Sequence, residues 1–277
     1  MVHSGTLGTW IWNIRSISKA DEVIAFLKSK GVSEAYLAYH PQTPHEEYRN
    51  FVRQCSLSRI RVAPIGADAA WILERGAREF RQFLDWFREY QAGCGSVEEK
   101  FYGIHFDVEP HQLAEWETQT AFVVERYKQF VMAAERFCRE ENVLLEVDIP
   151  FWFDKYTVAD RDEQLPLSEF CIRHCDTTLL MSYRDNARAA FECGKFELGL
   201  SEKYKKKVSL ALETGKIYEE VNITFYHLGT KALERELREL ARLVQEQSNP
   251  HEIGFAVHYY ECWSTLPDYG HPKGADY

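Results

Sequence analysis

Short apolar runs alternate along the whole chain with longer segments that have helical periodicity. The runs are apolar throughout rather than alternating with polar residues, which is typical of strands buried on both faces of a parallel sheet. Each is short and is followed by polar or glycine-containing sequence, as expected for strands. Eight such runs are present, at residues 9–12, 35–39, 60–65, 103–107, 144–149, 177–181, 208–212 and 254–257.

The segments between these runs carry apolar residues three and four apart, as the core-facing side of a helix requires. This spacing predicts helices over residues 20–30, 77–90, 120–140 and 231–247, and a weaker one over 45–54. The first is followed by Gly31, a residue that favours helix C-caps. The region between the sixth and seventh strands is expected to be short.

Repeated alternation of strand and helix predicts an α/β fold, a (β/α)8 TIM barrel, rather than a doubly wound sheet. The length of 277 residues suits a barrel of this kind, which takes about 250 residues. No Pro-rich or low-complexity linker divides the chain. We therefore expect a single barrel domain over residues 1–277.

Two carboxylates follow the apolar run 103–107, at Asp107 and Glu109. Residues two apart on a strand point to the same face, roughly 6–7 Å apart. Mutual repulsion and partial desolvation raise the pKa of one such group and leave the other ionised, which supplies an acid and a base. The alternative is a helix-capping Asp107 followed by a solvated Glu109.

Polar and aromatic residues also follow the other strands, and the C-terminal ends of barrel strands are where active sites form. Glu213 follows an unbroken apolar run, so we expect it to face the barrel mouth. Ordinary rim packing is the alternative for Tyr39, Tyr183 and Trp263. The expected substrate-binding residues are Tyr39, Asp148, Trp152, Tyr183, Glu213, His258 and Trp263.

The net charge of −10 argues against nucleic acid or an anionic membrane as a partner, because binding phosphate requires a basic face. One basic run, residues 203–207, is interpreted as a solvated connection. No stretch reaches transmembrane length.

Seven cysteines are present, an odd number without a CxxC pair. This pattern predicts free thiols in a reducing compartment. The N-terminus lacks a charged segment followed by an apolar run. A cytoplasmic location is therefore expected.

The segment Phe101-Tyr102-Gly103-Ile104-His105-Phe106-Asp107-Val108-Glu109 resembles the fourth-strand signature of glycoside hydrolase family 18, the chitinase-like barrels. That signature runs from Phe-x-Gly-Ile into alternating Asp residues that end in Asp-x-Glu. The resemblance implies that Glu109 is the general acid and that Asp107 orients the substrate's acetamido group, which itself attacks the anomeric carbon.

Two other places agree with this resemblance. Met181-Ser182-Tyr183 resembles the family's Met-x-Tyr segment at the end of strand six, which implies that Tyr183 contacts the acetamido group. Trp263 falls near the position where the family keeps a Trp at the floor of the sugar site.

Three positions depart from the family pattern. Tyr102 and His105 occupy its earlier Asp positions, and Arg184 stands where an acidic residue is expected after the Tyr. We therefore predict a glycoside hydrolase-like enzyme that acts on a small saccharide or glycoconjugate, with no cofactor and no metal. Two alternatives stay open: a barrel that binds carbohydrate without cleaving it, and a metal-assisted hydrolase or lyase that uses Asp107, Glu109, Glu213 and His258.

Overall fold

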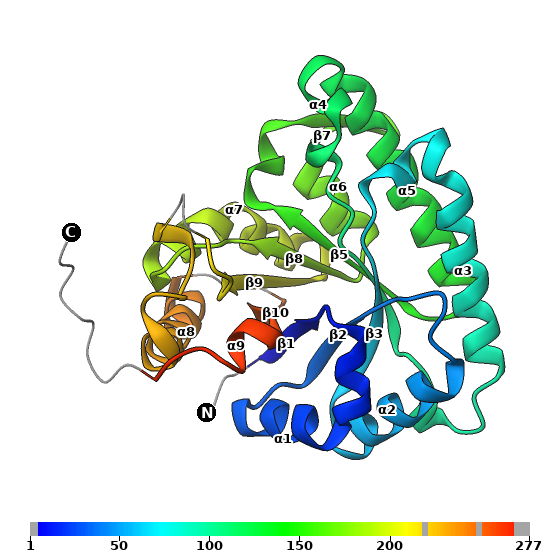
Figure 1. Cartoon of the computed structure of the whole chain (residues 1–277). Coiled ribbons are helices and arrows are strands. Elements are labelled where there is room, and N and C mark those ends of the chain that lie inside the picture. The colour runs from blue at the N-terminus through cyan, green and yellow to red at the C-terminus, as the bar shows by residue number, and fades with distance from the viewer. Residues whose placement is uncertain (1–4, 218–220, 248–250, 269–277) are drawn as a thin grey trace.

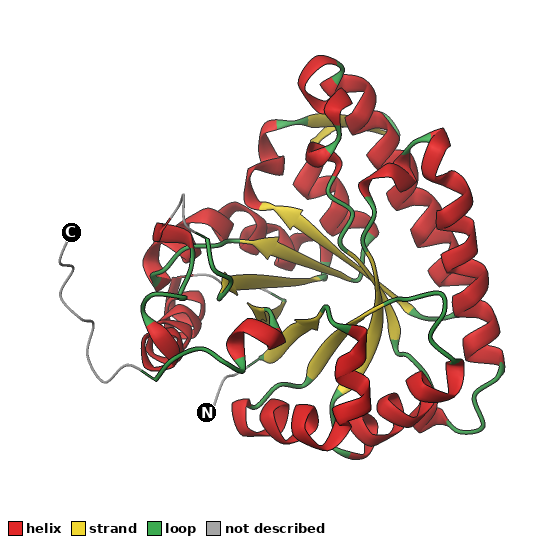
Figure 2. Ribbon diagram, viewed as in Figure 1, coloured by secondary structure: helices red, strands yellow, loops and turns green. Residues whose placement is uncertain are grey.

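A computed structural model describes residues 5–217, 221–247 and 251–268. All eight predicted runs are strands, and together they close a parallel barrel (Figures 1 and 2). This confirms the TIM-barrel fold. Around the barrel the strands follow the order β1 (Thr6–Ile11), β10 (Glu252–His258), β9 (Lys207–Glu213), β8 (Thr177–Met181), β5 (Leu144–Pro150), β4 (Gly103–Phe106), β3 (Arg61–Gly66) and β2 (Glu34–Ala38).

Helices surround the barrel and cover the outer face of its sheet (Figure 2). The predicted helices are all present, and the weakly predicted one, α2, spans His45–Leu57. Their apolar faces pack on the sheet, as Phe83 and Phe87 of α3 illustrate. The helices are α1 (Ala20–Lys30), α2, α3 (Ala77–Ala92), α4 (Ala114–Thr118), α5 (Thr120–Glu141), α6 (Leu167–His174), α7 (Ala187–Tyr204), α8 (Gly229–Gln247) and α9 (Tyr260–Trp263).

Two features between the strands differ from the sequence-based expectation. The region between β8 and β9 is not short, because the 18-residue helix α7 fills it. An antiparallel hairpin follows β5, with strands β6 (Thr157–Asp160) and β7 (Glu163–Pro166). It lies near α4, away from the barrel axis (Figure 1).

The basic run 203–207 is not wholly a solvated connection, which corrects that interpretation. Its last residue, Lys207, opens β9 and is buried. Its ammonium group donates hydrogen bonds to both carboxylate oxygens of Glu34, at 2.8 and 2.7 Å. A charged partner inside the barrel therefore draws this lysine away from solvent.

Bulky rings and charged groups fill the barrel interior, and glycines provide the space for them. Trp10 and Tyr36 are almost fully buried there. A Cβ atom on Gly8 would lie 2.5 Å from the hydroxyl oxygen of Tyr36, and one on Gly254 would meet Ser209 and Lys207. Both glycines are needed because the neighbouring side chains come too close to their backbone to leave room for a Cβ atom.

No helix in the described part of the chain is long and apolar enough to cross a membrane. The seven cysteines are all free, as predicted. Both ends of the predicted domain, residues 1–4 and 269–277, lie outside the described residues.

Candidate active site

Glu109 lies in a cleft at the C-terminal end of the barrel, just beyond β4. The cleft has a volume of about 270 Å³. The Glu109 side chain keeps 22% of its surface exposed, and one carboxylate oxygen lies 3.0 Å from Nε2 of His111. Besides these two residues, the cleft is lined by Pro150, Phe151, Trp152, Met181, Tyr183, Arg184 and Ile223.

Asp107 lies deeper than Glu109. Its backbone N–H donates a hydrogen bond to the carbonyl of Gly66, at 2.9 Å, which fixes the strand end. Burial, together with the negative charges of Asp148 and Glu109, raises the pKa of Asp107 well above its usual range.

Tyr183 connects the carboxylates that follow different strands. Burial raises the pKa of its hydroxyl well above the usual range, and so do the charges of Glu213, Asp148, Asp107 and Glu109. All four carboxylates thus lie within electrostatic range of one phenol. The structure brings Asp107, Glu109, Tyr183 and Glu213 together at the barrel mouth.

His258 packs beneath Tyr183, with the two rings stacked at a centroid distance of 5.7 Å. The indole N–H of Trp12 donates to Nε2 of His258, at 3.0 Å. Since an indole nitrogen only donates, Nε2 accepts and the ring proton lies on Nδ1, which donates to Glu213 at 2.7 Å. His258 is therefore a neutral imidazole with a fixed tautomer, and it orients Glu213.

Trp152 lies in the cleft wall, as expected. It is carried by a 3-10 helix, η6 (Phe151–Lys155), directly after β5. Its ring packs edge-on against His111 at 5.1 Å and near Trp116 at 6.0 Å. The wall is an aromatic surface beside Glu109, of the kind that stacks on flat ligand faces.

Three residues predicted to bind substrate lie elsewhere. Asp148 is buried one layer below the mouth, where Trp10 and His105 hydrogen-bond to its Oδ2, both at 2.8 Å. Tyr39 packs outside the barrel against Trp86, at 4.6 Å. Trp263 is 2% exposed and packs edge-on against Phe26 of α1, at 5.4 Å. None of these three side chains lines the cleft beside Glu109.

Several residues at the site were not predicted from the sequence. His111 touches Glu109, Trp12 fixes His258, and His105 bridges two buried carboxylates. His111 follows Glu109 by two residues, and strand-like spacing could have identified it. The partners of Trp12 and His105 come from other strands, so the local sequence contains no sign of these contacts.

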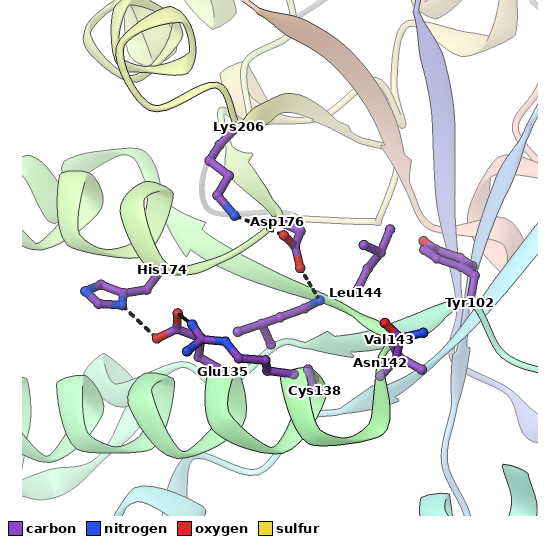
Figure 3. Close-up of a pocket in the computed structure, with 11 residues that line it drawn as sticks. Tyr102, Glu135, Cys138, Asn142, Val143, Leu144, His174, Asp176 and Lys206 are labelled. Carbon is purple, nitrogen blue, oxygen red and sulfur yellow. Dashed lines mark hydrogen bonds and ion pairs between the residues drawn. The ribbon is translucent and has the colours of Figure 1, made fainter.

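A second hollow, of about 360 Å³, opens at the N-terminal end of the barrel (Figure 3). Its charged groups pair with one another. Glu135 contacts His174 at 2.8 Å, and Asp176 binds Lys206 at 2.9 Å. This end of a TIM barrel usually serves stability, and the pairing fits that role.

Within residues 5–217, 221–247 and 251–268, no group of three or more His, Cys, Asp and Glu side chains is placed to hold a metal ion. Glu213 and His258 instead bind each other. The geometry therefore supplies no ligand set for the metal-assisted alternative.

The fold and the site define a TIM barrel with a polar, aromatic-walled C-terminal mouth. No protein-family model matches the chain, and no curated protein matches its sequence. Solved structures do match. The spore cortex-lytic enzyme SleL of Bacillus megaterium QM B1551 has a TM-score of 0.55 at 12% identity, covering 94% of this chain and 73% of that one.

Two further solved structures also match. A class V chitinase mutant from the plant Cycas revoluta, in complex with (GlcNAc)3, has a TM-score of 0.52 at 12% identity, over 93% of this chain and 95% of that one. Tryptophan synthase from M. tuberculosis has a TM-score of 0.47 at 10% identity, over 94% and 89%. At these identities the likeness is one of fold.

Proposed function

We propose that this protein is a glycoside hydrolase-like enzyme that acts on a saccharide or glycoconjugate. The observation that carries the proposal is a pair of carboxyl groups two residues apart: Glu109 is open to an aromatic-walled cleft, and Asp107 has one oxygen, Oδ1, buried without a hydrogen-bond partner among the described residues. Most glycoside hydrolases act through a pair of carboxyl groups that flank the bond they cleave. The strand-four resemblance to glycoside hydrolase family 18 supports the same assignment.

In this proposal Glu109 is the general acid/base. It donates its proton to the glycosidic oxygen as the bond from that oxygen to the anomeric carbon breaks, and it later takes a proton from the attacking water. Protonated Asp107 donates a hydrogen bond to the substrate group that stabilises the anomeric carbon. Tyr183 contacts the substrate from across the mouth, Glu213 supports it there, and Trp152 stacks on a sugar face.

A Glu109→Gln variant tests the assignment. Glutamine keeps the shape of the side chain but cannot donate an acidic proton, so we expect kcat on aryl glycosides or N-acetylated oligosaccharides to fall by about 10²–10⁴-fold. Circular dichroism and the thermal midpoint should stay unchanged. The matched control is Glu117→Gln on α4, which alters an exposed carboxylate outside the cleft and should leave kcat unchanged.

Unchanged turnover in Glu109→Gln would contradict the role of this residue. The departures at Tyr102 and His105 favour a second candidate function, a barrel that binds carbohydrate without cleaving it. Saturable oligosaccharide binding by the wild-type protein, with no product after prolonged incubation, would identify that function instead.

A further inference from the structure

His105 is fully buried in the barrel interior, at a position where the family signature has an Asp. Both of its ring nitrogens face carboxylates of β5. Nε2 lies 2.8 Å from Oδ2 of Asp148, and Nδ1 lies 3.3 Å from Oε2 of Glu146. The ring stacks on Tyr36 at a centroid distance of 3.9 Å.

The hydrogen-bond pattern identifies the charge on this ring. Each carboxylate oxygen also accepts a second donor, the indole N–H of Trp10 at Asp148 and the hydroxyl of Tyr102 at Glu146, both at 2.8 Å. An imidazole ring whose two nitrogens both meet carboxyl oxygens can donate to each of them only in its doubly protonated form. Burial opposes this charge, but Asp148 and Glu146 outweigh it and raise the pKa of His105 to about 10.

The charges inside the barrel balance without Asp107. Deeper in the barrel, Lys207 and Arg61 both bind Glu34. With the imidazolium of His105, three cations therefore face three carboxylates, those of Glu34, Glu146 and Asp148. An ionised Asp107 would be an excess negative charge in a desolvated site.

Asp107 is faced by four titratable groups: Asp148, Glu109, His105 and Tyr183. Two of these are carboxylates, and His105 is already held between Asp148 and Glu146. The Oδ1 atoms of Asp107 and Asp148 are both buried without a hydrogen-bond partner among the described residues. Leaving both groups ionised would carry the full cost of desolvation.

We propose that His105, Glu146 and Asp148 form a buried ion triad that holds Asp107 in its protonated form, so that Asp107 acts as a hydrogen-bond donor and not as a base. The three are positioning residues, because they act on substrate only through Asp107. The role in catalysis rests on the proposed function above. The protonation states do not, and they can be measured without turnover.

The first test is ¹⁵N NMR of the wild-type protein labelled at histidine. His105 is identified by contacts between its ring and Tyr36, so its assignment needs no variant. We expect both of its ring nitrogens to remain protonated at pH 8. His258 is the internal control, since its geometry requires one protonated and one bare nitrogen. A neutral His105 ring at pH 7 would overturn the proposal.

The second test is Asp148→Asn, followed by ¹³C NMR of the aspartate carboxyl groups. Asparagine retains an acceptor for Trp10 and His105 but removes the negative charge, so the Asp107 carboxyl should titrate at least about one pH unit lower than in the wild type. Asp85→Asn, on the exposed side of α3, is the control and should cause no shift. An unshifted Asp107 in a folded Asp148→Asn protein would also overturn the proposal.

Activity adds a third readout, which distinguishes failure of the ion-triad proposal from failure of the proposed function. In Asp148→Asn, the alkaline limb of the pH dependence of kcat/KM should move to lower pH by the same amount as the Asp107 titration. A wild-type protein without glycosidase turnover would contradict the proposed function. The two NMR outcomes would still decide for or against the triad.

Discussion

Gly8 shows how a single residue controls the barrel interior. It leaves the space into which the Tyr36 hydroxyl extends from the neighbouring strand. Tyr36 in turn stacks on His105 and packs edge-on against Trp10, at 5.2 Å. A side chain at position 8 would therefore disturb the ring on which the buried imidazolium rests.

We expect Gly8→Ala to lower the free energy of unfolding by about 1–3 kcal/mol, because the added Cβ overpacks the interior against Tyr36. Urea unfolding measures this change. Gly199→Ala is the matched control, since no atom lies within 4 Å of its added Cβ in helix α7. There the same substitution should stabilise the protein by about 0.5–1 kcal/mol. Equal effects at both positions would refute the role of Gly8.

The direction of a side chain decided which predicted site residues reach the mouth. Asp107 and Glu109 follow β4 directly, and Glu109 lines the cleft at the barrel mouth. Tyr39 follows the inward-facing Tyr36 by three residues, an odd offset that turns it outward. Trp263 lies in α9, beyond the strand, where no such alternation applies.

At the scale of elements, the segments inserted after β4 and β5 build the cleft wall. Helix α4 contributes Trp116, whose ring packs on Trp152 and on Tyr156. The hairpin β6–β7 was missed because its strands are largely polar and contain no continuous apolar run. The region that holds helix α7 was expected to be short because its glycines weaken the helical signal; Gly194 lies against Leu210 and Leu180, so tertiary packing compensates.

Helix α7 also carries a buried carboxyl group, Glu197, which is 1% exposed. Burial raises its pKa from the usual 4.5 to about 7. Between these two values the folded protein keeps a proton that the unfolded chain has lost. The contribution of Glu197 to stability is therefore fully present below about pH 4.5 and is lost as the pH rises through about 7.

A Glu197→Gln variant removes this titration. Relative to the wild type, its free energy of unfolding should rise by roughly 2–3 kcal/mol between pH 4 and pH 8, because only the wild type must bury a charge at the higher pH. Chemical denaturation across that range gives the comparison. Glu192→Gln, at a half-exposed site on the same helix, should show no such trend. Parallel pH curves for wild type and Glu197→Gln would contradict the assignment.

At the scale of the whole molecule, the apolar runs were sufficient to predict the barrel, because every strand of a parallel sheet is buried on both faces. The charged interior was not predictable from the same pattern. Three charged residues lie near the N-terminal ends of their strands: Glu34, Glu146 and Lys207. Charged residues near a strand end usually face solvent, so the sequence alone does not show that these are buried. Only barrel closure brings Glu34 of β2 opposite Lys207 of β9.

That pair joins two walls of the barrel which are separated in the sheet by β1 and β10. We expect Lys207→Met to lower the free energy of unfolding by about 3–5 kcal/mol, because it leaves the buried Glu34 with Arg61 as its remaining cation. Adding Glu34→Gln should recover part of the loss, since the uncompensated charge is then gone. Thermal and urea unfolding of Lys207→Met and of the double variant with Glu34→Gln measure the loss and the recovery of stability.

The control for this prediction is Lys195→Met on α7, which removes an exposed lysine whose ammonium group lies 3.5 Å from a carboxylate oxygen of Glu192. A surface pair of that kind contributes about 0–1 kcal/mol, so its loss should have little effect on unfolding. If Lys207→Met proved as mild as Lys195→Met, Lys207 would not be needed to neutralise the buried Glu34. The charge balance that we propose to keep Asp107 protonated would then be weakened, since it counts Lys207 among the three cations that face Glu34, Glu146 and Asp148.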